Sequence, residues 1–74
     1  MSTTEDRVIA IINDILEMKD LPQITYSPDL KLKEDIGLDS LDLAELTVKL
    51  EKEFSVDIFA DAIVQTLGEV IGKL

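Results

Sequence analysis

Ser40 is the residue of this chain with the clearest chemical potential, a hydroxyl set between Asp39 and Leu41 and followed by Asp42. It stands at the start of a predicted helix that ends near Phe54. The first backbone N–H groups of a helix lack intrahelical partners, so Ser or Asp is favoured there as a cap. Ser40 is therefore either the cap itself or, if Asp39 caps the helix, an exposed hydroxyl whose attached phosphate the helix dipole would stabilise.

The rest of the chain offers little catalytic chemistry. Its 74 residues include no Cys and no His, which excludes a thiolate nucleophile, a zinc–thiolate site and a Ser-His-Asp triad. No neighbour of Ser40 can remove its proton efficiently, so an enzyme that modifies Ser40 must supply the base. The aspartates do not have the spacing of a calcium-binding loop. We predict no catalytic residue and no metal site.

Composition indicates one small domain, residues 1–74, with a core of Leu, Ile and Val, because 46% of the residues are hydrophobic and only 4% aromatic. The net charge of −9 disfavours nucleic acid and an anionic membrane surface as partners. It suits either solubility alone or a partner with a basic patch. The acidic start and the lack of a long apolar run predict a cytoplasmic protein, which we expect to be monomeric.

Hydrophobic periodicity predicts helices at both ends of the chain. The first begins at a capping-box pair, either Ser2 and Glu5 or Thr3 and Asp6, and fades after Met18. Residues 20–39 form a long connection, of a kind that is often functional. The last helix begins at the capping pair Thr66 and Glu69. The apolar faces of these two helices are Val8, Ile11, Ile12, Ile15 and Leu16 in the first, and Leu67, Val70, Ile71 and Leu74 in the last.

Two details of this pattern need packing to support them. Leu30 and Leu32 alternate with polar residues, but no second strand is predicted, so we expect them to tie the connection to the core. Gly68 and Gly72 weaken the last helix, whose stability must then come from packing. With a short helix over residues 60–64, the predicted fold is an all-α four-helix bundle, three longer helices plus one short helix, with a long loop between helices 1 and 2.

The second predicted helix, from Asp39 or Ser40 to Phe54, carries two apolar stripes at about 100° per residue. We expect the longer stripe, Leu43, Leu46, Leu50 and Phe54, to enter the core. The shorter stripe, Leu41, Ala44 and Val48, would then lie near the surface between Glu45 and Glu51, as a docking surface for a partner. In the alternative, neighbouring helices bury both stripes.

The segment at residues 35–46, with the sequence DIGLDSLDLAEL, resembles the phosphopantetheine attachment motif of acyl carrier proteins of the stand-alone, type II kind. The resemblance covers nearly the whole chain, from the amphipathic first helix to the closing one. It implies that Ser40 carries 4′-phosphopantetheine, transferred from coenzyme A by a phosphopantetheinyl transferase, with Asp39 and Leu41 beside it. The thiol of that arm would hold an acyl group as a thioester.

The resemblance also implies the partners, which are acyl-loading, condensing and modifying enzymes with basic docking patches. By matching position, Leu41, Ala44 and Val48 would be the apolar contacts, and Asp39, Asp42, Glu45 and Glu51 the acidic ones. Lys52 stands where the fatty-acid members of the family usually have an acid, which favours a dedicated pathway such as polyketide or modified-lipid synthesis. The alternatives are a peptidyl or D-alanyl carrier and, from another class, an acidic helical interaction module without a prosthetic group.

Overall fold

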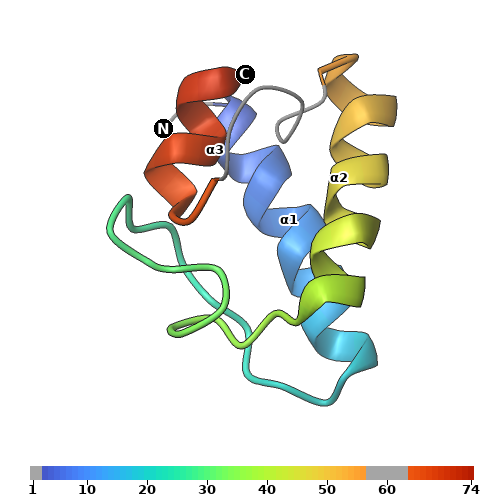
Figure 1. The fold of residues 1–74 in the computed structure, drawn as a ribbon, viewed down its shortest axis with the longest axis vertical. Helices are drawn as coiled ribbons and strands as arrows, with labels where there is room; N and C mark the ends of the chain where they lie inside the picture. The colour runs from blue at the N-terminus through green and yellow to red at the C-terminus, as the bar shows by residue number, and fades with distance from the viewer. Residues whose placement is uncertain (1–2, 57–63) are drawn as a thin grey trace.

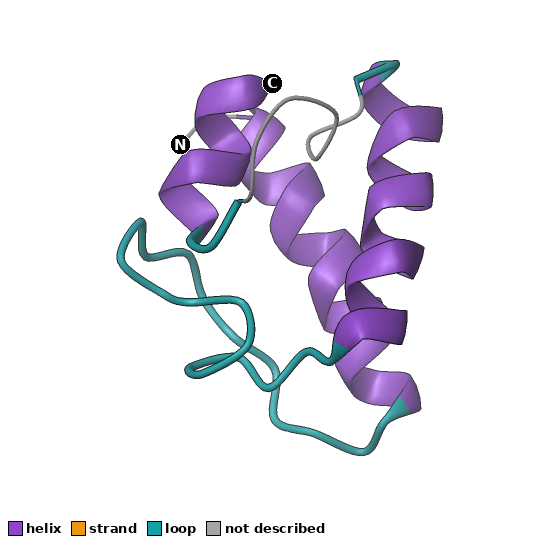
Figure 2. Ribbon diagram, viewed as in Figure 1, coloured by secondary structure: helices purple, strands orange, loops and turns teal. Residues whose placement is uncertain are grey.

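The computed structural model describes residues 3–56 and 64–74, which form three α-helices around a hydrophobic core (Figure 1). The helices are α1 (Thr3–Met18), α2 (Ser40–Phe54) and α3 (Leu67–Lys73). Figure 2 shows α1 packed beside α2, with α3 against α1 and a long loop joining the first two helices. The all-α prediction and the long loop are confirmed. Of the predicted short helix, residues 60–63 lie outside the described residues, and Val64 is buried but not helical.

Helix α1 forms where its apolar stripe predicts it, with Val8, Ile12, Ile15 and Leu16 buried and Ile11 partly buried. It ends in a Schellman motif, in which Leu21 N–H donates to Leu16 O at 2.9 Å and Asp20 N–H donates to Glu17 O at 3.1 Å. Asp20 has the left-handed φ of 60° that this motif requires. The last turn of α1 is therefore closed in a fixed geometry, which matters for the side chains that it presents.

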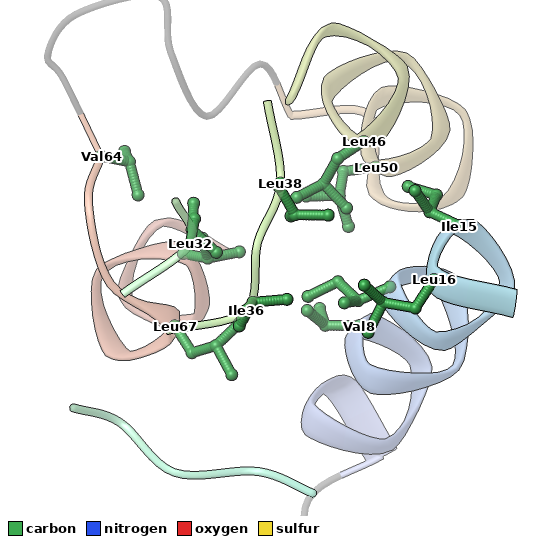
Figure 3. Packing of buried hydrophobic residues seen from close by; sticks show 12 residues of the cluster. Val8, Ile15, Leu16, Leu32, Ile36, Leu38, Leu46, Leu50, Val64 and Leu67 are labelled. Atoms are coloured by element: carbon green, nitrogen blue, oxygen red, sulfur yellow. The ribbon is translucent and has the colours of Figure 1, made fainter. Parts of the chain in front are cut away.

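The core consists of Leu, Ile and Val side chains, as the low aromatic content predicts (Figure 3). From α2 it takes Leu46 and Leu50, with Leu43 and Phe54 packed against it, so the longer stripe of that helix enters the core as expected. The buried set is Val8, Ile12, Ile15, Leu16, Leu32, Ile36, Leu38, Leu46, Leu50, Val64, Leu67 and Val70. Three of these residues, Leu32, Ile36 and Leu38, come from the long loop, which is therefore part of the core.

The loop is tied to the segment before α3 by backbone hydrogen bonds. Leu32 N–H donates to Gln65 O at 2.8 Å, and Leu67 N–H donates to Leu30 O at 3.0 Å. Between them Lys31 and Thr66 form an antiparallel bridge. Leu30 and Leu32 do tie the loop to the core, but the expectation that this segment lacks a strand partner is wrong at that one pair. The partner is a short stretch before α3 that carries no strand pattern of its own.

Two further contacts hold the loop against helices. The Asn13 side chain of α1 receives a hydrogen bond from Ile24 N–H at 2.8 Å and donates one to Ile24 O at 3.1 Å. At the start of α3, Gly68 N–H donates to Pro28 O at 3.0 Å. A Cβ at Gly68 would lie 3.1 Å from both the Cβ and the carbonyl oxygen of Pro28. The close approach of two backbones explains a glycine that weakens α3 locally.

Candidate functional site

The start of α2 is closed by a capping box built from two aspartates. Asp39 is the N-cap, with extended backbone angles, and its carboxylate accepts a hydrogen bond from Asp42 N–H at 2.9 Å. In return, the Asp42 carboxylate accepts one from Asp39 N–H at 3.1 Å. Two of the unpartnered donors at the helix start are thereby satisfied. The cap is Asp39, so Ser40 is not needed for capping.

The chain reaches this cap through Gly37, whose φ of +93° is in the left-handed region that favours glycine. On either side of Gly37, Ile36 and Leu38 are buried, with exposures of 7% and 2%. Leu38 N–H also donates to Leu32 O at 3.0 Å. The residues just before the cap are therefore anchored in the core, and the start of α2 is held in place relative to the rest of the molecule.

Ser40 is the first residue of α2 and is exposed to solvent. The next residue, Leu41, is 82% exposed. A hydroxyl in this position is accessible to another protein, and it lies at the positive end of a helix dipole, where a phosphate group is favoured. The structure thus places the predicted attachment residue at the surface, between a capping aspartate and an exposed leucine.

A cation from α1 lies against the same helix start. The Lys19 ammonium forms an ion pair and a hydrogen bond with Asp42, lies 3.8 Å from Asp39 Oδ2 and is 3.5 Å from Gly37 O. The hydrogen bond from Lys19 lowers the pKa of the Asp42 carboxyl, and the same bond raises the pKa of Lys19. Lys19 therefore neutralises part of the acidic charge beside Ser40 and ties the end of α1 to the start of α2.

Sequence reasoning missed this role of Lys19. The residue matches the negative end of the α1 dipole, and that local explanation is sufficient when only the sequence is known. Its partner Asp42 is 23 positions away. Only the antiparallel packing of α1 and α2 brings the two together, and nothing in the spacing of the two residues points to it.

The shorter stripe of α2 lies at the surface. Leu41 and Val48 are 82% and 53% exposed, and Ala44 between them is also exposed. The flanking acids Glu45 and Glu51 are exposed as well. The alternative in which both stripes are buried is wrong for this helix. Asp42 differs from the other predicted acidic contacts, because only 15% of its side chain is exposed and it is engaged by Lys19 and the cap.

Comparison with known protein families agrees with this geometry. Residues 6–74 match the family described as the phosphopantetheine attachment site. The chain belongs to this family. Its members are non-catalytic carriers, and membership implies a 4′-phosphopantetheine prosthetic group. The prosthetic group therefore supplies a thiol, which the cysteine-free chain does not have. Carrier domains of this kind interact with phosphopantetheinyl transferases and with biosynthetic enzymes.

The interaction module without a prosthetic group, considered from the sequence, is excluded by this family membership. The predictions of a phosphopantetheine arm and of a non-enzymatic role are confirmed at the level of the family. Within the described ranges, 3–56 and 64–74, none of the helices combines the length and the apolar character needed to cross a bilayer.

Proposed function

We propose that this protein is an acyl carrier protein that holds acyl intermediates as thioesters on a phosphopantetheine arm attached to Ser40. The proposal is carried by one observation: Asp39 caps α2, which leaves the Ser40 hydroxyl on the first turn, exposed and uncommitted to the cap. The positive end of the helix dipole favours the phosphodiester that attachment would create. The bound arm supplies the thiol that forms the thioester.

The surroundings of Ser40 support this assignment through charge. A phosphodiester beside Asp39 and Asp42 meets like-charge repulsion, which Lys19 reduces because its ammonium is paired with Asp42 and near Asp39. The Ser40 proton must leave during attachment, and no base of this chain stands beside it. A base of the transferase therefore accepts that proton, while the chain contributes the position of the oxygen and the charge around it.

The outer face of α2 is proposed as the surface that partner enzymes contact. Leu41, Ala44 and Val48 supply its apolar part. Asp39, Glu45 and Glu51 are exposed acids around it and suit a basic patch on the partner. Asp42 contributes mainly by holding the helix start, because its carboxylate is engaged inside the molecule.

The acyl cargo, rather than an aminoacyl one, is favoured by the residues around the serine, Leu38-Asp39-Ser40-Leu41, which are closer to acyl carriers. We further propose that residues 1–74 form a single carrier domain, and that it serves a dedicated pathway, since Lys52 departs from the fatty-acid members. A peptidyl or D-alanyl carrier is the second candidate. Intact-mass analysis of the loaded protein from cells separates the two, because the acyl or aminoacyl group changes the mass of the arm.

The test of the attachment site is intact mass after incubation with coenzyme A and a phosphopantetheinyl transferase. Wild type should gain the mass of one phosphopantetheine, and Ser40→Ala should gain none. Ser55→Gly is the matched control, because it removes another exposed serine, the C-cap just after α2, and glycine suits the left-handed φ of 59° at that position. It should be loaded like wild type. Loading of Ser40→Ala, or an unmodified wild type beside a carrier protein that the same enzyme loads, contradicts the proposal.

A further inference from the structure

The described part of the chain exposes three large hydrophobic side chains, and one of them is not on α2. Leu41 and Val48 belong to the outer face of α2, but Met18, which is 81% exposed, is the last residue of α1. A single exposed apolar residue on a surface needs no explanation. Met18 is different because of where the end of α1 lies.

The Lys19 contacts bring Met18 next to the start of α2. Lys19, the following residue, pairs with Asp42 and lies 3.8 Å from Asp39 Oδ2. The face of α1 that carries Met18 also borders α2, because Met18 follows Arg7 by eleven residues, close to three full turns. Arg7 Nη1 is 2.6 Å from Glu53 Oε1 of α2. Figure 1 shows the same arrangement, with the end of α1 beside the beginning of α2.

The usual size of a protein–protein interface gives a reason why an enzyme that acts on Ser40 should also contact Met18. A specific interface buries about 800 Å² on each partner, a roughly circular patch of about 16 Å radius. The whole surface of this chain is 4659 Å², so such a patch covers about one-sixth of it. An enzyme acting on Ser40 centres its contact on the first residue of α2. Its footprint therefore extends past the helix start onto neighbouring segments, and the end of α1 is one of them.

We propose that the docking surface for the phosphopantetheinyl transferase continues from α2 onto the end of α1, with Met18 as its apolar contact there. This proposal rests on the proposed function, since it names the partner of the Ser40 site. The acids around Met18 and Leu41 that remain exposed, Glu17, Asp39 and Glu45, suit an apolar pocket with a basic rim on the enzyme. Methionine is flexible and polarizable, which suits it to such a pocket.

The experiment measures steady-state kinetics of loading, with coenzyme A saturating and the unmodified carrier as the varied substrate. Met18→Gln removes the apolar contact without changing charge or helix propensity much, and it should raise KM about fivefold or more while kcat changes little. Met18→Leu restores an apolar side chain and should stay within about twofold of wild type. Ala10→Gln is the matched control, because Ala10 is exposed on α1 but lies about 12 Å earlier along its axis.

Met18→Gln should also keep the wild-type melting temperature, so that a higher KM reports docking and not folding. An unchanged KM for Met18→Gln, or equal KM values for Met18→Gln and Ala10→Gln, overturns the inference. These outcomes differ from failure of the proposed function, in which wild type itself remains unmodified or Ser40→Ala is loaded.

Discussion

Helices α2 and α3 begin with the same kind of cap, but the start of α2 is exposed to solvent and the start of α3 is buried. At α2, the Asp39 carboxylate accepts a hydrogen bond from Asp42 N–H at 2.9 Å. At α3, the Thr66 hydroxyl accepts one from Glu69 N–H at 3.3 Å. The residues after the two caps then diverge, since Ser40 and Leu41 are exposed whereas Leu67 is fully buried.

The difference lies in what covers each helix start. The loop carbonyl of Pro28 accepts a hydrogen bond from Gly68 N–H, and the Leu30 carbonyl accepts one from Leu67 N–H. The start of α3 is therefore under the loop. The start of α2 is approached from α1 by the flexible side chain of Lys19, and Leu41 keeps 82% of its surface exposed. A capping pattern thus determines where a helix begins. Packing then determines whether the start of the helix is buried in the fold or stays accessible to a partner protein.

The largest effect that tests this comparison is a matched pair of leucine truncations. Leu67→Ala should lower the free energy of unfolding by about 2 to 5 kcal/mol, because it leaves a cavity in the core. Leu41→Ala should change it by less than about 0.5 kcal/mol, because the side chain is already in solvent. Denaturant unfolding measures both values.

Loading kinetics should show the reverse ranking, with Leu41→Ala raising KM for the transferase and refolded Leu67→Ala close to wild type. Similar losses of stability in the two variants would show that the two helix starts do not differ as described.

The caps themselves should give an intermediate effect. Asp39→Ala and Thr66→Ala each remove a side-chain acceptor from a helix start and should cost about 0.5 to 2 kcal/mol of stability. Asp39→Ala should cost more, because the charged acceptor makes the shorter bond and also favours the helix dipole. Asp39→Asn keeps an acceptor and should recover most of the loss. Thermal or denaturant unfolding ranks the three. A larger loss for Thr66→Ala would contradict this ranking.

The sequence predicts most of this fold, because the helices and their buried faces follow from local periodicity. The stripe of α1, the longer stripe of α2 and the capping pair before α3 all lie where the pattern indicates. The predicted Ser40 is exposed and its flanking acids are found at the same helix start, since they occupy consecutive positions. Neighbours along the chain need no tertiary information to be placed together.

What the sequence does not predict are contacts between distant segments. The pairing of Lys19 with Asp42, the bridge between Lys31 and Thr66 and the approach of Gly68 to Pro28 each join residues more than twenty positions apart. None of these contacts produces a periodic pattern in the sequence, because each one joins a single residue of one segment to a single residue of another. The choice between Asp39 and Ser40 as cap also required the structure, since either residue type satisfies the same donors.

The two glycines of α3 test how closely the loop covers the start of that helix, through smaller changes in stability. A Cβ at Gly72 would meet nothing within 4 Å, so Gly72→Ala should raise the free energy of unfolding by about 0.5 to 1 kcal/mol through helix propensity. At Gly68 the same gain is opposed, because the new Cβ would lie 3.1 Å from the Pro28 backbone oxygen. Gly68→Ala should therefore be less stable than Gly72→Ala by about 1 kcal/mol or more. Equal stabilisation by both substitutions would mean that the loop does not hold the start of α3 closely.

The smallest expected change in stability comes from Lys19, whose side chain approaches the start of α2, because exposed ion pairs contribute little to stability. The hydrogen bond from Lys19 lowers the pKa of Asp42 in the folded state. A lowered folded-state pKa contributes stability above the pKa of the unfolded chain, and that contribution is lost as the pH falls through the folded-state value. Lys19→Met should therefore move the pKa of Asp42 up toward its ordinary value of 3.8, and the stability should then fall less steeply as the pH drops below that value.

The matched control for this charge is Lys73→Met, which removes a lysine from α3, at the opposite end of the molecule from the start of α2 (Figure 1). An NMR titration of the Asp42 carboxyl carbon, read beside unfolding free energies across the acid range, measures the change. Lys73→Met should leave the Asp42 titration where it is in wild type. If Lys19→Met also leaves it there, the ammonium does not hold the start of α2, and the placement of Met18 next to that helix start loses its physical basis.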